Sequence, residues 1–158
     1  MISNFPTKKL TNLGGLRSFK FIPAYRVASY PPLTAEGITS TLSLLPAQLW
    51  LNGYATPETL DFVEESKDSE NGVFYSQKLS GFVPGDCQDL SSLMAEMNGL
   101  PFVIQLTNPK NETKLIGISG YPLTFTSKFI SGSTRADSKG YQFEFSGESL
   151  FSAPAYLI

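Results

Sequence analysis

The sequence predicts a mainly β fold, in which antiparallel sheets form a β-sandwich or barrel-like structure with one packed α-helix at about residues 86–98. Apolar and polar residues alternate along several stretches, as expected of strands with one apolar face. Turn residues, chiefly Gly, Pro and Asn, separate these stretches. Residues 86–98 instead repeat their apolar positions with the period of a helix.

The length of 158 residues is about that of one domain, and it suffices for a hydrophobic core. We expect an N-terminal arm at residues 1–16, a single β-rich domain at 17–149 and an apolar C-terminal tail at 150–158. The arm contains Pro and Gly and shows no sustained apolar period. The tail is unusually apolar for a chain end. We expect both ends to be ordered mainly by contacts with other chains.

The region before the helix predicts several short strands. Residues 18–27 alternate aromatic and polar side chains, but Pro23 limits them to an edge strand or a bent one. Thr56 and Pro57 are typical of a helix start, although the residues after them fit a strand equally well. Further strands are predicted at residues 37–45, 48–54 and 73–82, and a polar turn at 68–72.

The helix at residues 86–98 is predicted by its two ends and its apolar stripe. Asp86 can cap the first turn, while Gly99 and Pro101 end the helix. A stripe at i, i+3, i+4 and i+7 is typical of a helix that lies across a sheet. It consists of Leu90, Leu93, Met94 and Met97.

The clearest strand pattern follows, between Pro101 and Gly147. The short loop at residues 108–112 predicts an antiparallel hairpin that joins 102–107 to 114–118. A longer polar loop at 131–140 separates the last two strands. Three strands have alternating apolar positions, which are Phe102, Ile104 and Leu106, then Leu123, Phe125 and Phe129, and finally Tyr141, Phe143 and Phe145.

The overall charge gives no basic field for nucleic acid, because the formal net charge is -2. Charged residues make up only 16% of the chain, against a typical value of about 25%. Such a low fraction is expected of a surface that neighbouring chains partly cover. It is equally ordinary in a neutral monomeric β-sandwich.

Charge is nevertheless unevenly distributed. Residues 1–35 carry five cations and no carboxylate, whereas residues 58–70 carry six carboxylates and one lysine. Either these are two solvated segments, or a basic arm meets an acidic loop on a neighbouring copy. In the second case, reversing Glu64 and Glu65 to Lys should weaken the oligomer without lowering monomer stability. The candidate interface residues are Lys8, Lys9, Arg17, Lys20, Arg26, Glu58, Asp61, Glu64, Glu65, Phe151, Tyr156 and Leu157.

The sequence contains no histidine, which excludes Ser-His-Asp hydrolysis, histidine acid-base catalysis and the common zinc sites. It also lacks the glycine spacing of a phosphate-binding loop. Carboxylates such as Glu144 are present, but no pattern places two of them together. We therefore expect no enzymatic activity, no cofactor and no metal.

The single cysteine, Cys87, excludes an intramolecular disulfide. There is no apolar signal core at the N-terminus, and no run approaches the roughly 20 apolar residues of a membrane span. We expect a soluble, unprocessed protein without a membrane partner.

The order of elements over residues 72–147 resembles structural proteins of tailed-bacteriophage virions, in the tail tube, tail terminator and head-tail connector ring class. The likeness lies in a strand, a short Leu/Met helix, a hairpin, and two long strands around a polar loop. It implies a ring-forming subunit of the virion that contacts copies of itself and other virion proteins, with DNA at most passing through a channel. The first 70 residues have no counterpart in that resemblance.

A monomeric carbohydrate-binding β-sandwich is the alternative interpretation. It would use exposed aromatic side chains, with Trp50, Tyr54 and Tyr121 as the candidates, to stack on sugar rings. Burial in the core is the competing explanation for each of them.

Overall fold

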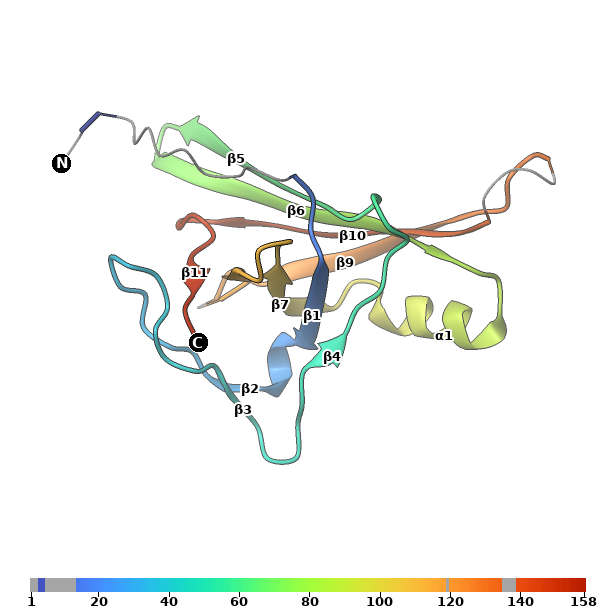
Figure 1. The fold of residues 1–158 in the computed structure, drawn as a ribbon, viewed down its shortest axis with the longest axis horizontal. Helices are drawn as coiled ribbons and strands as arrows, with labels where there is room; N and C mark the ends of the chain where they lie inside the picture. The colour runs from blue at the N-terminus through green and yellow to red at the C-terminus, as the bar shows by residue number, and fades with distance from the viewer. Residues whose placement is uncertain (1–2, 5–13, 119, 135–138) are drawn as a thin grey trace.

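A computed structural model describes residues 3–4, 14–118, 120–134 and 139–158. They form mainly antiparallel β-sheet with one short helix (Figure 1), which confirms the predicted fold class. In chain order the elements are β1 (Ser18–Pro23), the 3-10 turn η1 (Ala24–Arg26), β2 (Val27–Ser29), β3 (Ser43–Leu44), β4 (Leu51–Asn52), β5 (Asp61–Ser69), β6 (Gly72–Pro84), α1 (Gln88–Met97), β7 (Pro101–Thr107), β8 (Thr113–Ile116), β9 (Leu123–Ile130), β10 (Gly140–Ser149) and β11 (Ala155–Tyr156).

Strand β7 is the junction of the main sheet. One edge pairs with β1 along residues 102–107. The other edge is shared, because β8 pairs with residues 104–107 and β9 with residues 101–102. Two wings therefore meet at β7: one contains β4, β1, β8 and β11, and the other continues through β9, β10, β6 and β5.

Both faces of β7 are buried. Phe102, Ile104 and Leu106 point into a larger core, whereas Val103 belongs to a smaller core on the opposite face. The sequence pattern had indicated one apolar face, but Val103 is 0% exposed. A nearly continuous apolar run is the signature of a strand covered on both sides.

Phenylalanine rings fill the larger core, which lies between the two wings. The Phe125 and Phe145 centroids are 4.9 Å apart, and those of Phe102 and Phe145 are 5.5 Å apart, both pairs meeting edge to face. Helix α1 covers this core with Met94 and Met97. The contacting rings are Phe19, Phe21, Phe102, Phe125, Phe143 and Phe145.

The smaller core joins segments that are far apart in the sequence. It combines β1, β7 and β8 with the loop after β2 and with the chain end. Tyr156 of β11 is 7% exposed, and its hydroxyl oxygen accepts a hydrogen bond of 3.0 Å from the Leu42 N–H. The buried residues of the smaller core are Ile22, Ile38, Leu42, Val103, Leu115, Ile118 and Tyr156.

The first half of the chain contains shorter strands than predicted. Residues 37–45 and 48–54 provide only the two-residue strands β3 and β4, and the intervening Ala47 has a φ of 64°. Thr56 starts a turn rather than a helix, because Glu58 has a φ of 68°, which a helix does not allow. The acidic residues 58–70, expected as a loop, mostly form β5, which pairs with β6 along its whole length.

The predicted helix is present but two residues shorter at its start. Cys87 occupies the N-cap position without a side-chain cap hydrogen bond. Asp86, the predicted cap, instead forms an ion pair with Lys139 at 2.7 Å. Leu93 of the apolar stripe is 44% exposed at the edge of the larger core.

The hairpin and strand predictions after the helix are confirmed. β7 and β8 pair antiparallel across the short loop, and β9 pairs with β10 antiparallel from Ile130 and Gly140 onward. Phe129 is an exception to the buried pattern, because it is 43% exposed beside Tyr141, next to the Ile130–Gly140 end of this pair.

We predict that Phe145→Ala lowers the free energy of unfolding by about 3–5 kcal/mol, because it removes a central ring and leaves a cavity. The loss is measured by urea denaturation with far-UV circular dichroism. Phe129→Ala is the control for a partly exposed aromatic residue on β9, with an expected loss of about 1 kcal/mol or less. Equal losses in the two variants would contradict a core centred on Phe145.

Candidate functional site

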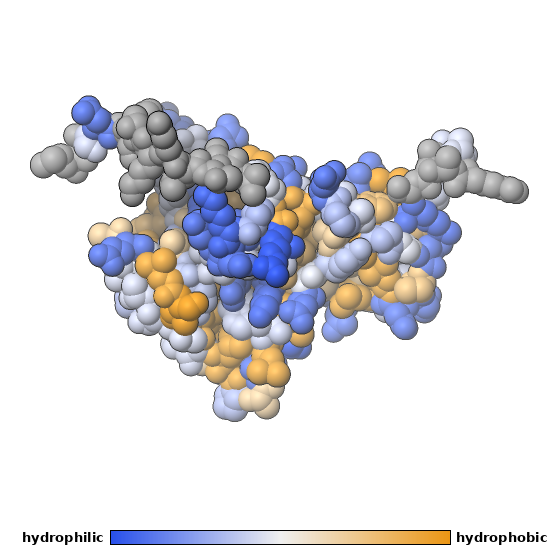
Figure 2. Space-filling view, viewed as in Figure 1, coloured by the Kyte–Doolittle hydropathy of each residue, from blue (hydrophilic) through white to orange (hydrophobic). Residues whose placement is uncertain are grey.

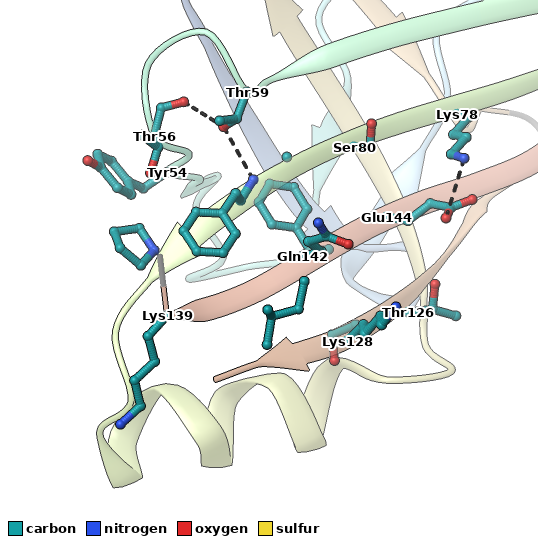
Figure 3. A pocket seen from close by; sticks show the side chains of 16 residues that line it. Tyr54, Thr56, Thr59, Lys78, Ser80, Thr126, Lys128, Lys139, Gln142 and Glu144 are labelled. Atoms are coloured by element: carbon teal, nitrogen blue, oxygen red, sulfur yellow. Dashed lines mark hydrogen bonds and ion pairs between the residues drawn. The ribbon is translucent and has the colours of Figure 1, made fainter. Parts of the chain in front are cut away.

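An open cleft of about 1030 Å³ lies over β6, β9 and β10. It lies on the face of the sheet opposite the phenylalanine core, because side chains alternate between the two faces of a strand. Figure 3 shows Ser80, Gln142 and Glu144 on this side of the strands. Register places Glu144 between Ser80 and Thr126, and Gln142 beside Lys128.

Three of the four charged side chains that line the cleft, those of Lys78, Lys139 and Glu144, form exposed ion pairs. Lys78 and Glu144 approach to 3.7 Å, and Lys139 contacts Asp86 outside the lining. Exposed pairs of this kind contribute little to stability. Their ammonium and carboxylate groups therefore remain available to hydrogen-bond a ligand.

Aromatic residues contribute to the cleft lining. Tyr54, which is 61% exposed, lies near Thr56 and Thr59 (Figure 3), and Phe82 of β6 also lines the cleft. Thr59 fixes the adjoining turn, since its hydroxyl donates to the Thr56 carbonyl oxygen and accepts from the Phe82 N–H. The Thr56 hydroxyl oxygen, also lining the cleft, is buried with no hydrogen-bond partner.

The lining of the cleft carries one carboxylate beside several hydroxyl, amide and ammonium groups. Among the described lining residues, Glu144 is the one carboxylate, so the paired carboxylates of glycoside hydrolysis are not assembled there. The described residues contain no group of three His, Cys, Asp or Glu side chains placed to hold a metal ion. Burial raises the pKa of the Tyr30 hydroxyl, but Tyr30 packs against the smaller core, outside the cleft.

Three of the predicted basic residues lie in the described part of the chain, each in a different setting. Arg17 donates a hydrogen bond to the Asn111 side-chain oxygen, and Arg26 lies 5.8 Å from the ring centroid of Tyr25. Lys20 is exposed on β1. Lys8 and Lys9 lie outside the described residues.

Three of the predicted acidic residues are exposed as expected. Glu58 occupies the turn before β5, while Asp61 and Glu65 lie on β5 itself. Asp61 and Glu65 therefore belong to the edge strand of the main sheet, not to a loop, whereas Glu58 lies in a turn.

Glu64 is different, because it holds the C-terminal segment, residues 150–158, to β5. Its carboxylate accepts a hydrogen bond of 2.7 Å from the Ser152 hydroxyl and another of 2.7 Å from the Ala153 N–H. The Gln77 side-chain amide donates a third, of 2.9 Å. The premise that Glu64 is a free surface charge is therefore wrong, and its reversal should also destabilise the monomer.

Gln77, which is 2% exposed, was not among the predicted site residues. One signal was present in the sequence: Gln77 alternates in step with Tyr75 and Leu79, so it shares their face of the strand, where a buried polar side chain needs a partner. The side-chain amide nitrogen of Gln77 donates a hydrogen bond to the Glu64 carboxylate, while the side-chain oxygen of Gln77 is buried without a hydrogen-bond partner.

The C-terminal segment packs partly on its own chain, which corrects the expectation that other chains mainly order it. Strand β11 pairs with β8, and the Leu157 N–H donates to the Ile38 carbonyl oxygen at 2.8 Å. Tyr156, a predicted interface residue, is buried in the smaller core. Phe151 and Leu157 remain 48% and 55% exposed.

Comparisons of the chain with known protein families, curated proteins and solved structures find no match. Within the described residues, no helix is long and apolar enough to span a membrane.

We predict that Glu64→Ala lowers the free energy of unfolding by about 2–4 kcal/mol, because it removes three charge-assisted hydrogen bonds and leaves the Gln77 donor buried. Faster amide exchange at Tyr156 and Leu157, measured by NMR, should accompany the loss. The matched control is Glu65→Ala, the exposed neighbour on β5, with little expected effect on either measurement. Comparable losses in both variants would contradict the role of Glu64.

Proposed function

We propose that this chain is a structural subunit that assembles with copies of itself into a ring, as in the tail or head-tail connector of a tailed-bacteriophage virion. In this proposal it has no catalytic activity, its other partners are virion proteins, and DNA at most passes through the channel. The proposal combines the resemblance in element order with the surface that the fold presents.

The observation that carries the proposal is the apolar surface of the C-terminal segment. Its own chain holds it at Glu64, β8 and Ile38, yet Leu150, Phe151, Leu157 and Ile158 are each 48% exposed or more. Figure 2 shows an orange hydrophobic patch where the chain ends in Figure 1. Anchored apolar side chains that face water are typical of a surface that another protein covers.

Ring formation also accounts for the low charge of the chain. A head-to-tail contact between copies closes into a ring when its rotation permits, and each copy then buries two surfaces. Only 16% of the residues are charged, which is few for a surface fully exposed to water. Burial of two surfaces in each copy would reduce the area that charged side chains must keep hydrated.

We predict that the purified chain sediments as an oligomer and that Leu157→Asp weakens its association about tenfold or more, because a charge replaces a buried leucine at each contact. Sedimentation velocity and negative-stain electron microscopy provide the measurement. Leu49→Asp is the control, since Leu49 is 79% exposed in the loop before β4. A wild-type chain that stays at 17.3 kDa at all concentrations would contradict the proposal.

A monomeric carbohydrate-binding module is the second candidate, and the cleft favours it. An exposed aromatic ring beside amide, hydroxyl, ammonium and carboxylate groups is a suitable lining for a sugar. Of the three candidate aromatics, Tyr54 lines the cleft, Trp50 packs against the smaller core, and Tyr121 contacts Phe151.

If the cleft binds oligosaccharides, Tyr54→Ala should reduce affinity about tenfold, since a stacking surface is lost. Isothermal titration against a panel of oligosaccharides measures this affinity. Tyr25→Ala is a matched control, because Tyr25 and Tyr54 are both 61% exposed and Tyr25 lies outside the cleft lining. A panel without any binding would exclude this candidate at the concentrations used.

A further inference from the structure

Strand β5 is the end of the main sheet. Within the described part of the chain it pairs with β6 alone, through nine residues without a register shift. Its outer edge runs along the top of Figure 1. A long edge of this kind presents a row of backbone N–H and C=O groups to which another strand can pair.

Charge on β5 determines which strand fits its edge. Asp61, Glu65 and Asp68 are exposed, against the single cation Lys67. A second β5 would be repelled, because antiparallel pairing about the strand centre places Glu65 opposite Glu65. A cationic extended segment would instead be attracted.

The chain contains such a segment. Residues 1–35 carry five cations and no carboxylate. Strand β1, with Lys20, is unavailable because β7 and β4 already pair with its two edges. Arg26 lies in η1, which is not extended. The remaining candidate is residues 5–13, which carry Lys8 and Lys9 and lie outside the described residues.

We propose that the outer edge of β5 binds residues 5–13 of a second copy of this chain as an added strand. This inference deepens the proposed assembly and rests on it. In one contact of the oligomer, backbone groups of β5 would pair with residues 5–13 of another copy. The acidic side chains of β5 would favour this segment because it carries Lys8 and Lys9.

The register of the β5–β6 hairpin identifies the residue that tests this pairing. Ser69 and Gly72 close a two-residue loop, so they form a hydrogen-bonded pair, and such pairs alternate along an antiparallel ladder. Ser66 therefore directs its N–H away from β6, toward the free edge. Proline at this position removes one outward donor and keeps the hydrogen bonds to β6.

We predict that Ser66→Pro weakens oligomer formation about tenfold or more, as measured by sedimentation velocity of the full chain. Ser66→Thr, which keeps the N–H, is the matched control and should assemble like the wild type. Circular dichroism and thermal unfolding verify that both variants fold. A second variant, Lys8→Glu with Lys9→Glu, tests the same contact from outside β5 and should weaken assembly to a similar extent.

Mixing the two defective proteins determines whether the contact joins two copies. The Ser66→Pro chain keeps an intact segment 5–13, and the Lys8→Glu, Lys9→Glu chain keeps an intact edge. An equimolar mixture should therefore form a heterodimer that neither protein forms alone. High salt should weaken that heterodimer, because charge contributes to the contact.

Two outcomes overturn this inference while leaving the proposed assembly intact. One is a Ser66→Pro oligomer as stable as the wild type, with Leu157→Asp still disruptive. The other is a mixture that shows no heterodimer, which would mean that residues 5–13 do not pair with β5 of another copy. A monomeric wild-type chain overturns both proposals.

Discussion

The burial of β7 on both faces is the constraint on which the rest of the structure depends. Phe102 and Ile104 require the phenylalanine core on one side, and Val103 requires the smaller core on the other. One edge takes β1, while β8 and β9 divide the other. The two wings of the sheet diverge where β8 and β9 share one edge of β7, and the larger core fills the space between the wings. The outer face of β9 and β10 remains uncovered and forms part of the cleft.

Glu64 connects this framework to the end of the chain. Its carboxylate receives donors from β6 and from the C-terminal segment, while Tyr156 inserts into the smaller core. Polar contacts therefore hold the segment at Ser152 and Ala153, and apolar contacts hold it at Tyr156. Ala153 and Tyr156 occupy the buried positions of the segment, and Phe151 and Leu157 remain in water. An interface built on this segment would be preorganised before a partner arrives.

The surfaces available for binding lie on different parts of the sheet. The cleft covers the outer face of β6, β9 and β10, whereas β5 presents a backbone edge and the chain end presents apolar side chains. Assembly through the last two would leave the first open to solvent or to another partner. Binding in the cleft and assembly into a ring are therefore physically compatible, and variants in different parts of the chain can separate the two candidate functions.

The sequence by itself determined the features that depend on local patterns. Alternation from Phe102 to Phe145 predicted the strands and hairpin after the helix, and the spacing of Leu90, Met94 and Met97 predicted the helix. Local pattern failed where distant contacts decide, as at residues 37–54, which pack on the smaller core instead of forming long strands. Only the tertiary structure decided the role of Glu64, because two of its donors, Ser152 and Ala153, are 88 and 89 residues away in the chain. The period of apolar residues predicts which face of its own helix or strand a residue occupies. The packing of the elements against one another determines which residue from a distant part of the sequence contacts it on that face.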